Sequence, residues 1–375
     1  MDGQERRTFV NATRLPEDWH IIRARYEAWW EGKPLDRPLV RLTAPRSPIN
    51  HASPPSDEAA LFNWLTDPQQ VLPRLEHNLA STFYTGDAFP WLDPMSQGLA
   101  AIQAAYHGAP YRVDPRTLTG WTEPLFNDWQ NRPTFRLDPA NRWWQATRLL
   151  LAEGARRSQD RYIITIPDLQ GGGEILALLR GSQELALDLL DCPEQIAPAL
   201  QEINLAWYEF YTECYRIIHQ GAGPRSGYVD WLGIWSEKPA VTVECDFSVM
   251  VSPAMFERHF LPSVEQQVSW VGRAIYHLDG PGAIPHLDAL LSLPGLRAIQ
   301  WVPTPGRPRQ VDWIPLLQRI QLAGKAVVIA CDPDEIPRLL RSLDPSHLVL
   351  TTTCATPQAA LDLLESIVHP QGVWI

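Results

Sequence analysis

The sequence of 375 residues has no long apolar run. No stretch approaches the roughly 18–20 consecutive apolar residues that a membrane-spanning helix needs. The opening residues Met1-Asp-Gly-Gln-Glu-Arg-Arg are polar and lack the apolar core of a signal peptide. Hydrophobic residues make up 45% of the chain and charged residues 20%, which is typical of a globular domain. We therefore expect a soluble, cytoplasmic protein with no membrane contact.

Clusters of basic residues are also missing. The formal net charge is −11 and the isoelectric point is about 5.4. A protein that binds the phosphate backbone of nucleic acid needs grouped lysines and arginines. The acidic balance therefore argues against a nucleic-acid partner and favours a small-molecule substrate.

Cysteine is scarce, and the five that occur are scattered along the chain. An odd, dispersed set in a chain of this length does not resemble a disulfide framework. We expect reduced thiols, of which one or two serve as metal ligands. The cysteines are Cys192, Cys214, Cys245, Cys331 and Cys354.

No Gly-x-Gly-x-x-Gly motif follows the first predicted strand, so a dinucleotide-binding fold has no support. The chain does contain a regular alternation of strands and helices from Asn141 onward, and short loops between such units imply a parallel sheet. At this length we expect a closed (β/α)8 barrel rather than an open doubly wound sheet. We treat 1–375 as a single domain, in which about 1–140 is an irregular N-terminal part that includes the first strand, and 141–375 holds the regular units.

Two polar residues, His277 and Asp279, end one of the predicted strands. Side chains at positions i and i+2 of a strand point the same way, so this imidazole and carboxylate should face a common side. Gly280 and Pro281 follow and open a loop. Polar side chains at the carboxyl ends of barrel strands are where such folds keep their chemistry.

The other predicted strands end in a similar way, and on a barrel these ends converge on one mouth. The residues concerned, apart from His277 and Asp279, are Asp168, Asp230 with Trp231, Cys245 with Asp246, Gln300 with Trp301, Cys331 with Asp332, and Cys354. Each has a structural alternative, such as a helix cap or a small core residue. The 16 tryptophans are mostly expected in the core, but Trp231, Trp235 and Trp301 lie beside loop residues and are predicted to line the pocket.

Two chemistries suit this set of residues. Zinc binds imidazole and thiolate, and a catalytic zinc needs three protein ligands and one open position. His277 and Cys354 would supply two ligands, with a third from Cys245, Asp279 or Glu244. Without metal, His277 and Asp279 would form an acid–base pair.

The chain resembles the uroporphyrinogen decarboxylase superfamily, and within it the corrinoid-linked methyltransferase-like branch. The resemblance extends over nearly the whole chain and is specific only when its segments are taken together. The segments are Gly32-Lys-Pro-Leu-Asp-Arg-Pro38, Leu178-Leu-Arg-Gly181, Asp246-Phe-Ser-Val-Met-Val-Ser-Pro253, Tyr276-His-Leu-Asp-Gly280, Ile299-Gln-Trp-Val302 and Ala323-Gly-Lys325. It implies a (β/α)8 barrel with its cleft at the carboxyl ends of the strands, and it makes a homodimer plausible.

The departures from the family pattern separate its two branches. The decarboxylases carry an Arg-Gln-Ala-Gly-Arg-type segment for a substrate with many carboxylates, and the sequence lacks it. The methyltransferase branch holds zinc through His-x-Cys on one strand and a cysteine near the last strand. His277 and Cys354 occupy two of those places, whereas Asp279 replaces the middle cysteine.

The sequence therefore favours a zinc-dependent methyltransferase-like enzyme. It would move a methyl group between a small methylated substrate and a thiol or a corrinoid carried by a partner protein. The first alternative is a metal-independent lyase or decarboxylase that uses His277 and Asp279, with Asp168 or Asp230 as a second carboxylate. The second is a non-catalytic protein that holds a small ligand in an aromatic mouth.

Overall fold

The computed structural model describes residues 14–47, 53–99, 102–223, 226–304 and 309–369. Its centre is a seven-stranded sheet in the order β2-β1-β11-β10-β9-β8-β7. All neighbours in this sheet are parallel except β2, which runs antiparallel to β1. The strands are β1 (Leu39–Pro45), β2 (Thr82–Gly86), β7 (Val241–Val243), β8 (Ala274–Asp279), β9 (Leu296–Val302), β10 (Ala326–Ala330) and β11 (Leu348–Thr353).

Two small ladders complete the strands among the described residues. Strand β3 (Trp91–Leu92) pairs with β6 (Ile163–Ile164) in parallel, and β4 (Tyr111–Asp114) forms a hairpin with β5 (Thr119–Thr122). The segment that leads to Asp230 contacts both sheets: the carbonyl of Val229 accepts a hydrogen bond from Ile166 N at 3.3 Å, and the carboxylate of Asp230 accepts one from Thr242 N of β7.

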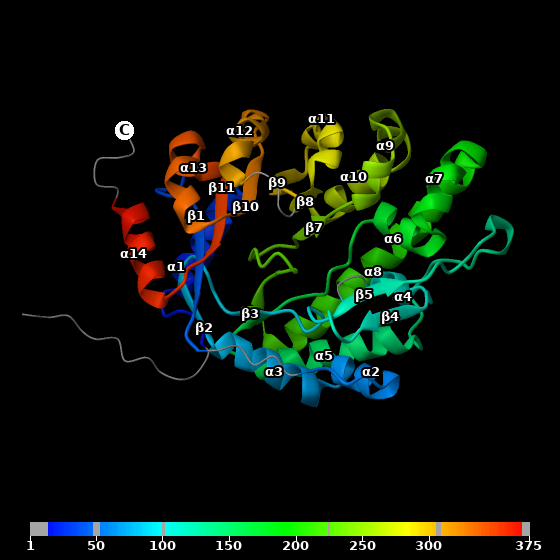
Figure 1. The fold of residues 1–375 in the computed structure, drawn as a ribbon, viewed down its shortest axis with the longest axis horizontal. Coiled ribbons are helices and arrows are strands. Elements are labelled where there is room, and N and C mark those ends of the chain that lie inside the picture. The colour runs from blue at the N-terminus through cyan, green and yellow to red at the C-terminus, as the bar shows by residue number, and fades with distance from the viewer. Residues whose placement is uncertain (1–13, 48–52, 100–101, 224–225, 305–308, 370–375) are drawn as a thin grey trace, which may run out of the picture.

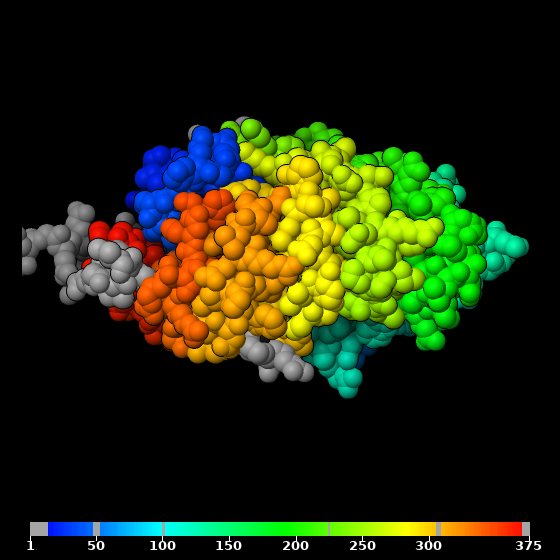
Figure 2. Space-filling model, turned by 90° about the horizontal axis from the view of Figure 1, so that it is seen from above, coloured from blue at the N-terminus to red at the C-terminus, as the bar shows by residue number. Residues whose placement is uncertain are grey.

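Helices flank the sheet on both sides (Figure 1). Helices α9 to α13 lie over the strands β7 to β11 (Figure 1), and in the view from above the segments from α9 to α13 occupy the middle of the molecule (Figure 2). Helices α2, α3, α5 and α8 lie on the far side of the molecule from them. The helices are α1 (Trp19–Trp30), α2 (Glu58–Thr66), α3 (Pro68–Ala80), α4 (Gln103–Tyr106), α5 (Arg142–Ser158), α6 (Gly172–Arg180), α7 (Ser182–Asp191), α8 (Ile196–Ala222), α9 (Pro253–His259), α10 (Leu261–Val271), α11 (Leu287–Leu291), α12 (Ile314–Leu322), α13 (Ile336–Ser342) and α14 (Pro357–Val368).

Local sequence explains several of these boundaries. Helix α5 begins after Asn141, whose side chain accepts hydrogen bonds from the backbone N–H groups of Trp143 and Trp144. Helix α14 begins after Thr356, which caps it in the same way and is followed by a proline. Strand β10 is an unbroken apolar run, Ala-Val-Val-Ile-Ala, as expected for a parallel strand covered on both faces.

The alternation of strands and helices confirms the predicted α/β class and the parallel sheet. The strand pairing assigned among the described residues leaves the sheet open between β7 and β2, so closure into a barrel stays a prediction. The N-terminal part, apart from residues 1–13, 48–52 and 100–101, which lie outside the described residues, is more regular than expected. It contains four helices and five strands. In the part that the structure describes, no helix is long and apolar enough to span a membrane.

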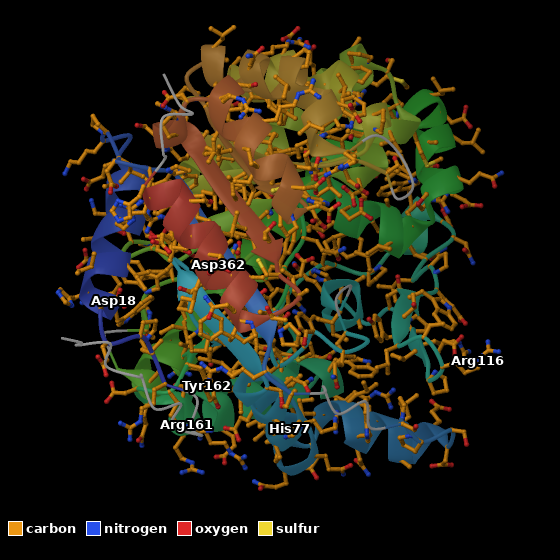
Figure 3. The ribbon with its side chains drawn as sticks, turned by 60° about the vertical axis from the view of Figure 1, so that its left-hand side comes forward. Asp18, His77, Arg116, Arg161, Tyr162 and Asp362 are labelled. Atoms are coloured by element: carbon orange, nitrogen blue, oxygen red, sulfur yellow. The ribbon has the colours of Figure 1, made fainter. Side chains whose placement is uncertain are left out.

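Side-chain contacts tie this N-terminal part to the strands. Glu76 of α3 accepts a hydrogen bond from the hydroxyl of Tyr162 at 2.8 Å, next to β6 (Figure 3). At the opposite edge of the molecule, Arg116 extends from the β4–β5 hairpin into solvent. The side chain of Arg116 is 86% exposed. A substitution at this position should therefore have little effect on the fold, which makes it a suitable control.

Candidate active site

The two faces of the main sheet bury different sets of side chains. One face, which we call the inner face, carries a compact apolar cluster with Leu39, Ile275, Ala298, Val328 and Val349. The other face, which we call the outer face, packs against the helices. Its side chains come from the alternate positions of the same strands, such as Val40, Leu278, Val327 and Leu350. Because side chains alternate along a strand, residues two positions beyond the inner-face cluster also face inward.

His277 and Asp279 belong to this inner face, since they follow Ile275 on β8 at steps of two. Asp246 joins them from the start of a 3-10 helix, Asp246–Met250, directly after β7. One potential ligand atom from each of the three residues lies within 4.8 Å of the others. His277 and Asp246 are half-buried and Asp279 is exposed, so the group is open to solvent on one side.

A hydrogen bond to Gln300 fixes the orientation of the His277 ring. Nδ1 of His277 lies 2.6 Å from Oε1 of Gln300 on the neighbouring strand β9, and the two residues are direct partners in the parallel ladder. A carbonyl oxygen only accepts, so Nδ1 carries the proton. Nε2 of neutral His277 therefore keeps its lone pair free for a proton or a metal ion.

The Trp231 indole supports the same imidazole from another side. The two ring centroids are 5.4 Å apart and the planes meet at 84°, the edge-to-face arrangement that aromatic pairs favour. Trp231 is half-buried. The prediction that Trp231 lies at the site with Gln300 thus agrees with the contacts of His277.

The carboxylates of Asp246 and Asp279 accept no hydrogen bond from any described residue, whereas those of Asp168 and Asp230 accept hydrogen bonds from backbone N–H groups. Burial raises the pKa of Asp246; the charge of His277 opposes this shift and that of Asp279 adds to it. Two carboxylates with free oxygens beside an oriented imidazole form a group that can bind a cation or move a proton.

Further carboxyl groups lie behind this cluster. Burial, with the charges of Asp230, Asp93 and Asp246, raises the pKa of Asp168 to about 8, although Gln170 N donates a hydrogen bond to it at 2.9 Å. Asp230 is buried and accepts hydrogen bonds from the backbone N–H groups of Leu232 and Thr242. Burial raises its pKa as well. The predicted site residues Asp168 and Asp230 therefore belong to one acidic region together with Asp246.

Three further acidic residues belong to this region: Glu244, which the sequence offered as a possible third metal ligand, and Glu174 and Asp93, which it did not single out. Burial raises the pKa of Glu174 to about 7, with Asp246 adding to the shift, and burial raises that of Glu244 far above its usual value. Burial also raises the pKa of Asp93 to about 7. Glu244 had a sequence signal, because it lies two residues before Asp246 on the same face. Asp93 follows the two-residue strand β3, and Glu174 lies inside a helix, so neither follows a recognisable strand pattern.

The two cysteines predicted as ligands lie elsewhere. Cys245 and Cys354 are buried in the outer-face core, and neither sulfur lies within the group formed by Asp246, His277 and Asp279. A Cβ added to Gly173 would come 2.6 Å from Sγ of Cys245, so this thiol points at helix α6. The alternation of the strands explains this position, since Cys245 is one residue out of step with Asp246 and therefore lies on the opposite face.

Two of the predicted pocket tryptophans pack into the core, and neither has a ring contact with His277 among the described residues. Trp301 is fully buried on the outer face, next to Trp313 with ring centroids 4.9 Å apart. Trp235 packs against Trp19 of helix α1 at 5.9 Å and donates a hydrogen bond to the carbonyl of Ser226. These residues stabilise the core, and we do not include them in the site.

The donor set fits a divalent metal ion. Imidazole nitrogen and carboxylate oxygen are both zinc ligands, and three protein ligands leave the open position of a catalytic site. Gln300 supplies the outer hydrogen bond that metal-binding histidines usually make. This set lacks the soft thiolate ligand of the predicted His–Cys site. Its carboxylate and imidazole ligands suit other divalent metals as well as zinc.

Comparison with known proteins gives the fold and little more. No family model matches the chain, and no curated protein matches it. Among solved structures, a "methyltransferase from Methanosarcina mazei" is similar, with a TM-score of 0.55 and 12% sequence identity. The match covers 93% of this chain and 98% of that one. At this identity the likeness shows a shared α/β architecture, and the resemblance to the corrinoid-linked branch stays a prediction.

Proposed function

We propose that the protein is a metal-dependent methyltransferase. In this proposal the six parallel strands of the main sheet close into an eight-stranded barrel, with β3 and β6 completing the ring. The observation that carries the proposal is the convergence of Asp246, His277 and Asp279 at the solvent-exposed ends of adjacent strands. The methyltransferase-named structure of the same architecture supports the choice of reaction.

In this proposal Asp246, Asp279 and Nε2 of His277 would hold the metal ion, for which zinc is the first candidate. When bound, the ion would act as a Lewis acid on a sulfur, oxygen or nitrogen atom of the substrate. Gln300 keeps the proton on Nδ1, so that Nε2 presents its lone pair. Trp231 restricts the rotation of the imidazole and covers one side of it against water.

Two acidic residues behind the cluster have pKa values raised into the neutral range. Asp168 and Glu174, with pKa values of about 8 and about 7, can donate a proton to a leaving group or retain one from an incoming thiol. The methyl acceptor in the proposal is a thiol or a corrinoid on a separate protein. The exposed position of Asp279 gives such an acceptor access to the cluster.

The proposal can be tested by measuring methyl transfer after a chelator has removed the metal and again after zinc has been added back. Protein stripped with a chelator should lose transfer of methyl groups to cob(I)alamin or to a thiol, and one equivalent of zinc should restore it. His277→Ala should fall at least about 100-fold in turnover, as expected for loss of a metal ligand. Cys354→Ser is the matched control and should retain full activity. Activity that survives chelation, or that disappears in Cys354→Ser, would overturn the proposal.

The raised pKa values favour one second candidate, a metal-independent lyase or decarboxylase. Buried carboxyl groups that titrate near neutrality can act as general acids, with His277 as the base. This enzyme would turn over a small organic acid after chelation, and Asp168→Asn would reduce turnover while leaving the metal content unchanged. A protein that binds such ligands without turnover would fit the non-catalytic alternative instead.

A further inference from the structure

An arginine lies on the inner face among apolar side chains. Arg41 follows Leu39 on β1 at a step of two, which places it on the same face as His277 and Gln300. The residue is only 7% exposed. A buried guanidinium without a counter-charge is costly, and native proteins rarely keep one unless it is paired.

The structure shows no protein counter-ion for this arginine. Nη1 of Arg41 donates one hydrogen bond, to the carbonyl of Leu232 at 2.9 Å, although a guanidinium has five N–H donors. Among the described residues no carboxylate comes within ion-pair distance of Arg41. Arg41 and Asp87 both lie close enough to the Tyr26 hydroxyl to influence its pKa. Asp87, however, is already paired with Arg25 and Arg37.

A second free donor lies beside Arg41. A Cβ built on Gly233 would lie 2.6 Å from Nη2 of Arg41 and 2.6 Å from Nε1 of Trp91. The two N–H groups therefore approach the same side of the Gly233 backbone. The indole N–H of Trp91 has no acceptor among the described residues, and Trp91 is half-buried. Gly233 has a φ of +69°, so the absence of a side chain permits both this turn and the close approach of the two donors to its backbone.

We infer that Arg41 and Trp91 bind an oxyanion, a carboxylate or sulfonate carried by the small substrate. The inference rests on the proposed function, since it assigns a chemical class to the molecule that reacts at His277. Guanidinium groups recognise planar or tetrahedral oxyanions through paired hydrogen bonds, and the indole N–H adds a third donor. Within the sheet, β1 and β8 are separated by β11, β10 and β9. The substrate would thus direct its anionic end toward β1 and its reacting end toward β8.

Titration with inorganic sulfate, and in parallel with acetate, tests this assignment at constant ionic strength against chloride. The readouts are the melting temperature and the heat of binding. Wild-type protein should show a saturable rise in melting temperature, because a ligand that binds only the folded state stabilises it. Arg41→Met should weaken sulfate binding at least tenfold. Trp91→Phe, which keeps the ring but removes the donor, should weaken it about threefold to tenfold, within the range of a lost hydrogen bond.

Two further variants separate this site from the metal cluster. Arg116→Met removes a surface charge and should bind sulfate like the wild type. His277→Ala should lose the metal and keep sulfate binding, whereas Arg41→Met should keep the metal and lose sulfate binding. In chloride buffer Arg41→Met should melt at or above the wild-type temperature, because no ion pair is lost and a buried charge is removed. A sulfate response that is absent from the wild type, or unchanged in both Arg41→Met and Trp91→Phe, would show that the oxyanion site does not exist.

Discussion

Nδ1 of His277 and Oε1 of Gln300 lie 2.6 Å apart on neighbouring strands. This hydrogen bond selects the tautomer that presents Nε2 to the cluster, so Gln300 acts as a positioning residue. Gln300→Met should reduce metal affinity by about 10-fold to 100-fold, the usual effect of losing an outer hydrogen-bond acceptor.

Competition with a fluorescent chelator measures this affinity. Gln300→Glu is the matched control, because its carboxylate still accepts the proton from Nδ1. Its affinity should stay within about threefold of the wild type. Equal losses in the Met and Glu variants would mean that Gln300 acts through packing rather than through the tautomer of His277.

Asp168 makes the stability of the fold depend on pH. Its pKa lies at about 8 in the folded protein, compared with an ordinary value of 3.8. The folded state therefore retains a proton that the unfolded chain releases, and the free energy of unfolding falls as the pH rises from about 4 to about 8. Asp168→Asn removes this penalty. It should raise the melting temperature at pH 8.5 and leave it almost unchanged at pH 4.

The control for this experiment is Asp362→Asn on the exposed surface of helix α14 (Figure 3). Its melting temperature should follow the wild type at both pH values. A gain in Asp168→Asn that is equal at pH 4 and pH 8.5 would contradict the assignment, because such a gain would come from packing and not from titration.

The position of Cys245 can be checked through Gly173. A methyl group on Gly173 would come 2.6 Å from Sγ of Cys245 and 2.9 Å from a ring carbon of Phe260. Gly173→Ala should therefore reduce the free energy of unfolding by about 1–3 kcal/mol, as overpacking of a core does. In a Cys245→Ala background the same change should cost less. Denaturant unfolding of the four proteins measures this coupling, and a cost that is independent of Cys245 would mean that the thiol points elsewhere.

The contact between Trp231 and His277 should also be measurable. Edge-to-face aromatic pairs contribute about 0.5–1.5 kcal/mol beyond the area that they bury. A double-mutant cycle with Trp231→Leu and His277→Ala should give a coupling energy in this range in metal-free protein. Trp231→Phe should preserve most of it. A coupling near zero would show that Trp231 does not hold the imidazole.

The regular part of the fold follows closely from the sequence. Helices α1 (Trp19–Trp30) and α5 (Arg142–Ser158) and strand β10 (Ala326–Ala330) are examples of this. These segments have clear periodicity or unbroken apolar runs. The small strands β3 and β6 have only two residues each, and their pairing depends on tertiary contacts. Local patterns therefore contain no signal for them.

For the candidate site, the sequence predicted His277, Asp279 and Asp246, which the structure brings together, and also Cys245 and Cys354, which lie outside that group. The choice of Cys245 and Cys354 followed residue chemistry and family resemblance. The alternation of the strands places these thiols on the outer face. Counting in steps of two from Ile275 and Leu39 would have assigned His277 and Arg41 to the inner face. The approach of Arg41 to Trp91 depends on the turn at Gly233, which no spacing in the sequence predicts.

Metal content measured by mass spectrometry of purified protein tests the central claim most directly. Wild-type protein and Cys354→Ser should each hold about one equivalent of a divalent metal. His277→Ala and Asp246→Asn should hold less than about a tenth of that amount, since each loses one of three ligands. A wild-type protein that binds no metal after equilibration with zinc, or a His277→Ala variant that retains a full equivalent, would contradict the account.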